Sequence, residues 1–313
     1  MEPIEIIRIS LISMIALVNI YFIYAHFKQV HQDIHRCEEV IKANSLTFYK
    51  AFSKIKDRKK RHAVYAVYAF CRYADDLIDE ANDEEGLLQL KEDLDAYVKE
   101  HKAPNYIFRA LNHTTKSFYA KDYDYNPFYD MIKGQLMDYR FIGYDTYEQL
   151  LDYCYHVAST VGLMLVPILS KEHSEQLTDF AINLGYGMQI TNILRDIGED
   201  AKKGRIYIPK QEISRANYTI HDLSHGKINV EFINMFEALA KKAEAYFEQA
   251  LSDINLFPKD VRIPLGLSIV LYRDILNACR ESEYDVFSKK NFVSEERKNI
   301  LIKTYIHTFE QGR

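Results

Sequence analysis

The sequence predicts an all-α protein, and three observations support this fold class. Only 11 Gly and 7 Pro residues occur among 313, so few positions interrupt a helix. Ala, Leu, Glu and Lys, which favour helices, are abundant throughout the chain. Alternation of apolar and polar residues, the pattern of a strand, is not sustained anywhere. With 48% hydrophobic residues the chain is also long enough to bury a large core.

The helices follow from the apolar periodicity and from the residues that interrupt it. Pro104 and Pro127 suit helix starts, and Pro258 separates two late helices. A turn is expected at 143–145, and a loop with a short extended piece at 202–209. No linker divides residues 31–313, which we expect to form one domain. Helices are expected at about 31–43, 60–81, 85–100, 104–119, 125–139, 146–170, 174–199, 230–255, 260–282 and 294–310.

Charge and cysteine content exclude several classes of protein. Lys plus Arg is 40 and Asp plus Glu is 45, and a net charge of −5 argues against a nucleic-acid partner. The glycine fingerprints of Rossmann and P-loop nucleotide sites are absent. The four cysteines lie far apart without CxxC pairs, so neither a zinc site nor a disulfide framework is indicated: Cys37, Cys71, Cys154 and Cys279.

The first 30 residues form a hydrophobic extension. Ile9 to Ala25 is an uncharged run of 17 residues, which at about 1.5 Å per residue barely spans a hydrocarbon core of roughly 30 Å. Glu2 and Glu5 do not fit a secretory signal. Three interpretations stay open: a membrane anchor or interfacial helix, an extra helix packed on the domain, and a mis-assigned start with Met14 as an internal alternative.

Basic residues follow this extension. If the run spans a membrane, Lys28 and Arg36 place the main domain in the cytoplasm, at the cytoplasmic face of the membrane. The segment 54–61 (KIKDRKKR) is very basic. It suits a solvated helix entry, and it also suits contact with anionic lipid headgroups.

One helix carries carboxylates beside its apolar face. Asp75 and Asp79 flank that face rather than lying opposite it, and Tyr68 and Arg72 lie in the same strip. Buried carboxylates without partners are costly, but two at i, i+4 can bind Mg²⁺ together with substrate phosphates. An acidic cluster of this kind is weak evidence on its own. The apolar stripe consists of Val64, Val67, Cys71, Ala74 and Ile78.

A second helix repeats this arrangement. Its residues 192, 196 and 200 step by four, and Arg195 between them can bind a phosphate with two hydrogen bonds. Two acidic helices, each with an Arg, suggest a diphosphate held by bridging Mg²⁺. The polar strip of this helix consists of Gly185, Gln189, Asn192, Asp196 and Asp200.

With these motifs the chain resembles the squalene/phytoene synthase family, the head-to-head prenyl synthases, and is most similar to bacterial dehydrosqualene (4,4'-diapophytoene) synthases. The resemblance covers about residues 34–292. The matching stretches are NSLTFYKAF (44–52), YAFCRYADDLID (68–79), YCYHVASTVGLMLVPIL (153–169), GMQITNILRDIGED (187–200), GRIYIP (204–209) and YDVF (284–287).

The resemblance implies a single-domain isoprenoid synthase fold, with helices around a central cavity, and a role for each matched residue. Tyr68 lies beside the reacting carbons, Tyr153 and Tyr272 are further cavity tyrosines, and Arg205 lies in a flap. The implied ligands of several Mg²⁺ ions are Asp75, Asp79, Asn192, Asp196 and Asp200. The implied catalytic residues are Tyr68, Arg72, Asp75, Asp79 and Tyr153. The implied substrate-binding residues are Asn44, Ser45, Leu46, Thr47, Phe48, Phe52, Tyr68, Arg72, Gln189, Arg195, Arg205 and Tyr272.

One position departs from the family pattern. Where relatives commonly read VAGxVG, this chain reads VASTVG, with Ser159 at the third position. We expect its hydroxyl to narrow a close helix approach or to bond back to a carbonyl one turn earlier.

The resemblance implies an Mg²⁺-dependent prenyltransferase. It would join two farnesyl diphosphates through a cyclopropyl (presqualene) diphosphate into C30 dehydrosqualene, the first step of a C30 carotenoid pathway, without NADPH. Two enzyme alternatives stay open: phytoene synthase, acting on two geranylgeranyl diphosphates, and squalene synthase with NADPH. A non-enzymatic helical assembly protein of the same fold would not need all five metal ligands. The apolar product suggests association with a membrane, and the sequence leaves the oligomeric state open.

Overall fold

The structure, a computed structural model, describes residues 3–170 and 175–311. Within these ranges it contains helices and loops without strands, which confirms the expected all-α class. The α-helices are α1 Pro3–Asn44, α2 Leu46–Phe52, α3 Arg58–Asp79, α4 Glu84–Glu100, α5 Tyr106–Thr115, α6 Asn126–Tyr139, α7 Tyr147–Cys154, α8 Thr160–Leu169, α9 Glu175–Lys202, α10 Lys210–Arg215, α11 Ile220–Ser224, α12 Val230–Ser252, α13 Lys259–Glu281 and α14 Glu295–Glu310. A π-helical turn covers Tyr155–Ser159 and a 3₁₀ turn covers Asp253–Leu256.

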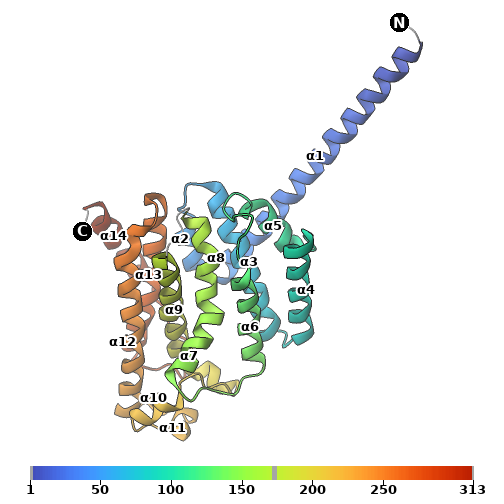
Figure 1. The fold of residues 1–313 in the computed structure, drawn as a ribbon. Helices are drawn as coiled ribbons and strands as arrows, with labels where there is room; N and C mark the ends of the chain where they lie inside the picture. Colours follow the sequence, from blue (N-terminus) through green and yellow to red (C-terminus); the bar gives the residue numbers. More distant parts are fainter. Residues whose placement is uncertain (1–2, 171–174, 312–313) are drawn as a thin grey trace.

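Helix α1 is far longer than the helix expected at 31–43. It runs without a break from the hydrophobic extension into the bundle, because no Gly or Pro lies between Ile4 and Asn44 to end it. Val30, Ile34, Cys37 and Ile41 form its buried stripe, which packs against α3 and α5. The preceding residues project away from the bundle (Figure 1).

Two helix starts differ from the expectation. Helix α5 begins at Tyr106 rather than at Pro104, because Asn105 caps it by accepting hydrogen bonds from the backbone of Ile107 and Phe108 at 3.0 and 3.3 Å. Helix α2, in a segment where no helix was expected, is capped by Ser45, whose hydroxyl accepts from the backbone of Phe48 at 3.5 Å. Pro127 lies in the first turn of α6, as expected.

The helix expected at 146–170 is divided by the π-helical turn. At this turn Ser159 donates a hydrogen bond to the carbonyl of Ile182 on α9, at 2.8 Å. The expected alternative, a bond to a carbonyl one turn earlier, is wrong for Ser159, and the neighbouring Thr160 makes such a bond to His156, at 2.8 Å. The helices approach closely here, since a Cβ on Gly185 would lie 2.4 Å from the Cα of Ser159. Gly185 is therefore required for this packing.

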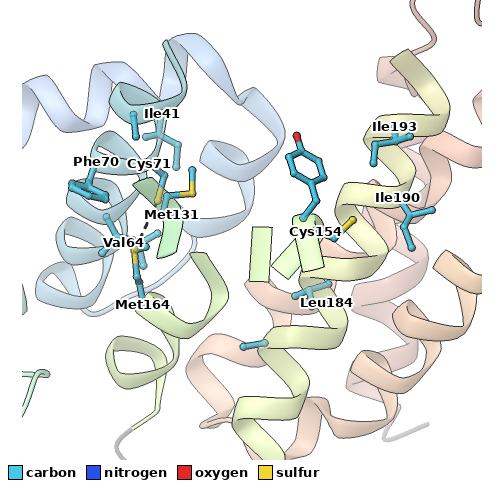
Figure 2. Close-up of a cluster of buried hydrophobic side chains, with 14 of the residues drawn as sticks. Ile41, Val64, Phe70, Cys71, Met131, Cys154, Met164, Leu184, Ile190 and Ile193 are labelled. Carbon is cyan, nitrogen blue, oxygen red and sulfur yellow. Dashed lines mark hydrogen bonds between the residues drawn. The ribbon is translucent and has the colours of Figure 1, made fainter. Parts of the chain in front are cut away.

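The core lies between α3, α8 and α9. Figure 2 shows Val64, Phe70 and Cys71 of α3 beside Met164 of α8, with Leu184 and Ile190 of α9 on the other side of the view. All four cysteines are buried and free, as the sequence suggested. By length and composition, one helical stretch of the described residues, Tyr147–Leu169, is apolar enough to cross a membrane, and half of it is buried inside the bundle.

Candidate active site

The first carboxylate cluster lies near the C-terminal end of α3. Arg72 pairs with Asp75 at 3.1 Å, and it also contacts Asp76 and Glu80. Burial, followed by the charge of Asp79, raises the pKa of Asp75 from 3.8 to about 7. The two carboxylates therefore lie where a further positive charge would be stabilised.

The second cluster lies near the C-terminal end of α9. Arg195 forms two hydrogen bonds with Asp196, at 2.8 and 2.6 Å, and Lys290 lies 3.4 Å from the same carboxylate. Asn192 accepts a hydrogen bond from the hydroxyl of Tyr272 at 2.6 Å, and its amide donates to Gln189 at 3.3 Å.

Asp200, one turn beyond Asp196, completes this cluster. Burial, followed by the charge of Asp196, raises the pKa of Asp200 to about 7. Both clusters thus contain a carboxyl group whose ionised form is disfavoured by burial and by a neighbouring carboxylate.

An apolar cavity lies between α3 and α9. Tyr68 lies on its α3 wall, one turn before Arg72, and Phe48 of α2 stacks on Tyr272 with ring centroids 5.7 Å apart. The cavity lining includes Ile41, Phe48, Phe52, Val64, Tyr68, Ala158, Val161, Gly162, Leu165, Leu169, Phe180, Leu184, Gly185, Met188 and Phe257. Three of the implied substrate-binding residues, Phe48, Phe52 and Tyr68, are therefore gathered around one cavity.

Residues 44–47, which the resemblance implies to be substrate-binding, form the turn at the corner between α1 and α2. Asn44 is exposed, with its amide donating to the carbonyl of Val40 at 3.0 Å, and Leu46 is also exposed. None of residues 44–47 belongs to the cavity lining, whereas Phe48 does. A role of this turn in binding substrate stays a prediction.

The flap that follows α9 crosses to α3. Arg205 lies 2.8 Å from Asp79, so a single ion pair ties the flap to the first cluster. Tyr207, two residues on, is buried and stacks on Tyr153 with ring centroids 5.2 Å apart. Tyr153 thus lies beneath the flap and is not part of the cavity lining.

Sequence reasoning missed Asp138, which lies beneath the flap. Its two carboxylate oxygens accept hydrogen bonds from Tyr153 at 2.8 Å and from Tyr207 at 2.6 Å. Burial raises the pKa of Asp138 to about 6, although both tyrosine hydroxyls favour its ionised form. Its charge also raises the pKa of Asp75 and Asp200, which places it near both clusters.

The signal for Asp138 was present in the sequence. It falls seven residues after the buried Met131 and so lies on the buried face of α6. A carboxylate on or beside the buried face of a helix was the criterion that identified Asp75 and Asp79. Applied to α6, the same criterion would have identified Asp138.

The donor atoms of the two clusters suit Mg²⁺. They are carboxylate and amide oxygens, which hard divalent cations prefer, and they include two carboxyl groups whose raised pKa calls for positive charge. Among the described residues no three His, Cys, Asp or Glu side chains converge on one point. Arg72, Arg205 and Arg195 pair with the carboxylates instead, so binding Mg²⁺ requires these ion pairs to open.

Comparison with known proteins agrees with this geometry. A family model of squalene/phytoene synthase matches residues 41–297. The 15-cis-phytoene synthase of Synechococcus elongatus is 35% identical over 282 residues, covering 84% of this chain and 88% of that protein. Phytoene synthase 3 of Zea mays is 33% identical over 283 residues, covering 88% of this chain and 66% of that protein.

Solved structures give the same result. A dehydrosqualene synthase in complex with ligand superposes with a TM-score of 0.85 at 38% identity, covering 91% of this chain and 99% of that chain. The squalene synthase HpnC of Alicyclobacillus acidocaldarius superposes with a TM-score of 0.73 at 28% identity, covering 82% of this chain and 96% of that chain. The chain therefore belongs to the squalene/phytoene synthase family, a family of prenyltransferases.

Proposed function

We propose that this protein joins two molecules of farnesyl diphosphate head to head, through a cyclopropyl (presqualene) diphosphate, into C30 dehydrosqualene. The observation that carries this proposal is that the carboxylate clusters of α3 and α9 each begin about one turn beyond a residue, Tyr68 or Met188, that lines the same apolar cavity. We assign the two carboxylate clusters to the two diphosphates, and the apolar cavity to the two prenyl chains.

The charged residues of the site have different roles. Arg72, Arg195 and Arg205 bind diphosphate oxygens, because a guanidinium donates paired hydrogen bonds to such anions. Mg²⁺, when bound by the carboxylates, neutralises the leaving diphosphate and so favours ionisation of the allylic ester.

The cavity wall protects the cation that ionisation leaves behind. Its lining is apolar, which excludes the water that would quench an allylic cation. Tyr68 lies between the carboxylates of α3 and the cavity, where its ring can stabilise positive charge on the reacting carbons.

The C15 chain length is supported by two aromatic rings of the cavity lining. Phe48 and Phe52 stack with ring centroids 5.9 Å apart, and Phe52 is only 6% exposed. Their rings fill space that a longer chain would need. Phytoene synthesis from two C20 geranylgeranyl diphosphates is the second candidate, because the curated relatives reported above are named phytoene synthases.

Product analysis tests this proposal. Purified protein is supplied with Mg²⁺ and either diphosphate, with and without NADPH, and the hydrocarbons are identified by mass. We expect C30 dehydrosqualene from farnesyl diphosphate, no reduction to squalene by NADPH, and no product from Asp79→Ala. Mainly C40 phytoene from the wild type would overturn the chain length. Squalene formed with NADPH would overturn the expectation that NADPH is not used.

The place of the reaction follows from its product. A C30 hydrocarbon is insoluble in water, so we propose that the enzyme works at the cytoplasmic face of a membrane. Lys28 and Arg36, which follow the apolar run of α1, support this orientation.

A further inference from the structure

Residues 12–27 of α1 carry large apolar side chains on every side of the helix. These side chains are 48–67% exposed, and no described element packs over them (Figure 1). Asn19 satisfies its amide within the helix, donating to the carbonyl of Ile15 at 2.9 Å. A helix that binds in a protein groove needs an apolar stripe on one face only, whereas a helix apolar all round suits a lipid bilayer. The exposed residues are Ile12, Met14, Ile15, Leu17, Val18, Ile20, Tyr21, Phe22, Ile23, Tyr24 and Phe27.

Positive charges surround the base of this helix, where it enters the bundle. The charges of His26 and Lys59 lower the pKa of His113, after burial, so these three groups of α1, α3 and α5 lie near one another. Burial, followed by the charges of Arg58 and Arg61, likewise lowers the pKa of His62. We define the basic collar as the cations of these segments: Lys28, two residues after His26, and Lys54, Lys56, Arg58, Lys59 and Arg61, which precede or begin α3.

The collar is not neutralised by the protein. None of its members forms an ion pair with any residue whose side chain the structure describes. The nearby Asp57 caps α3 through hydrogen bonds to the backbone of Lys59 and Lys60, and the nearby Glu38 accepts from Tyr49 at 3.2 Å. A ring of uncompensated cations at the base of an apolar helix matches the anionic headgroups of a bilayer.

One part of the prenyl cavity lies at this same pole of the bundle. Lys60, the residue after Lys59 of the collar, donates to the carbonyl of Leu169 at 3.3 Å and lies 3.5 Å from Asp260. Leu169 lines the cavity, so the cavity reaches toward the end of the bundle at which α3 begins. The carboxylates lie toward the opposite pole, since Asp79 is the last residue of α3 and Asp200 precedes the flap that leads to α10 (Figure 1).

We propose that the basic collar seats this pole on an anionic bilayer with α1 inserted, so that the part of the prenyl cavity lined by Leu169 faces the lipid. The diphosphate site then faces the aqueous side, where its charged substrates and products are soluble. The hydrocarbon product lies next to the phase in which it dissolves. The evidence for contact with lipid comes from α1 and the collar alone. Only the identity of the product rests on the proposed function.

Binding of the full-length protein to vesicles, measured without substrate, tests the proposed contact with the bilayer. We expect tight binding to vesicles of phosphatidylglycerol and phosphatidylcholine, and weaker binding to pure phosphatidylcholine. Leu17→Asp combined with Ile20→Asp should weaken binding at least 100-fold. Arg58→Gln combined with Lys59→Gln should weaken binding to anionic vesicles about 25-fold. The N-terminus of a helix carries a partial positive charge, so removing two cations from the first turn of α3 favours this helix. The variant should therefore fold.

Matched controls separate these effects from general changes of surface. Ile142→Asp replaces a side chain that is 92% exposed in the loop after α6, and Lys133→Gln combined with Lys241→Gln removes two exposed charges from α6 and α12. Both should bind as the wild type does. Equal binding of the wild type to both vesicle types would overturn the role of the collar. A soluble oligomer that pairs through α1 and does not bind vesicles would overturn the proposal as a whole.

Turnover tests the orientation of the cavity. Anionic vesicles should raise the steady-state rate of hydrocarbon formation several-fold, because the product leaves into lipid. Arg58→Gln combined with Lys59→Gln should keep the rate measured without vesicles and lose the stimulation. A wild-type rate that vesicles leave unchanged would overturn the orientation. Vesicle binding without any turnover would reject the proposed function while leaving the seat of α1 in place.

Discussion

The Nη1 atom of Arg205 lies 2.8 Å from Oδ1 of Asp79, joining the flap after α9 to the end of α3 across 126 residues of sequence. The guanidinium neutralises a carboxylate that we assign to Mg²⁺. When metal and diphosphate bind, Asp79 gains another cation and Arg205 gains another anion. This ion pair is therefore the contact that must exchange as the site fills.

This exchange of ionic partners predicts that Arg205→Met strongly lowers the rate of the reaction. The variant loses a charged contact with diphosphate, and such contacts contribute about 1.5–3 kcal/mol. We expect kcat/KM for diphosphate release to fall about 10- to 100-fold. Lys210→Met, which removes an exposed ion pair with Asp145, is the control and should stay within twofold of wild type. A rate for Arg205→Met that matches this control would assign the flap arginine a structural role only.

Loss of single carboxylates should abolish turnover. Asp75→Ala, Asp79→Ala and Asp196→Ala each remove an oxygen donor that we assign to Mg²⁺, and we expect at least a 1000-fold loss in rate with farnesyl diphosphate. Asp179→Ala, which removes an exposed carboxylate from α9, is the control. Rates are measured over a magnesium titration, with folding checked by circular dichroism. If the three folded variants kept near wild-type rates, the metal assignment would be wrong.

The raised pKa of Asp75 predicts a stability change with a definite sign. Between about pH 4 and 7 the folded, metal-free protein keeps a proton on Asp75 that the unfolded chain has released, so this group favours folding at low pH. That contribution is lost as the pH rises through 7. Asp75→Asn cannot ionise and should be more stable than the wild type at pH 8 without metal. Because about a third of the Asp75 side chain is exposed, we expect about 1–2 kcal/mol rather than the full shift.

Urea unfolding at pH 8 and pH 4, with EDTA and with Mg²⁺, measures this effect. The advantage of Asp75→Asn should vanish at pH 4 and reverse with Mg²⁺, which stabilises only the protein that binds it. An equal difference at both pH values would show that ionisation of Asp75 does not cause it.

Asp138 should act through the flap. Asp138→Asn retains one acceptor oxygen for two tyrosine hydroxyls, and we expect a loss of about 1–2 kcal/mol in stability and about tenfold in rate. Tyr207→Phe should add little to Asp138→Asn, because both changes break the same hydrogen bond. Tyr218→Phe, which removes a hydrogen bond to the carbonyl of Lys227, is the control and should leave the rate unchanged. Additive losses would show that Asp138 and Tyr207 act independently.

The fold was predictable from the sequence where periodicity and capping act locally. The buried face of α3, with Val64 and Cys71 inside, followed from spacing alone. The start of α5 was misplaced because Pro104 and Asn105 both suit a helix start, and hydrogen bonding decided between them. The bond from Ser159 to Ile182 was not predictable, because it depends on how closely α9 approaches.

In the site, too, features of a single helix were predictable and features of tertiary packing were not. The strips on α3 and α9 were visible as carboxylates beside apolar faces, a property of each helix by itself. The position of Tyr153 beneath the flap, against Tyr207, depends on tertiary packing and could not be read from either segment. Asp138 was detectable on its own helix, but its tyrosine partners come from distant parts of the chain.

Phe52 should limit the length of the substrate. It is 6% exposed, lines the cavity and stacks on Phe48, so its ring fills volume that a fourth isoprene unit would need. Phe52→Ala should open that volume and admit C20 geranylgeranyl diphosphate, with a loss of about 3–5 kcal/mol in stability. Phe236→Ala is the matched control, because it removes an equally large buried ring that is not part of the cavity lining. It should lose similar stability and still make only C30 product.

Both variants and the wild type are supplied with equal amounts of the C15 and C20 diphosphates, and the hydrocarbons are identified by mass spectrometry. If Phe52→Ala folds and still rejects the C20 substrate while Phe48→Ala accepts it, Phe48 limits the chain length. If neither accepts it, these two aromatic side chains do not set the length of the product.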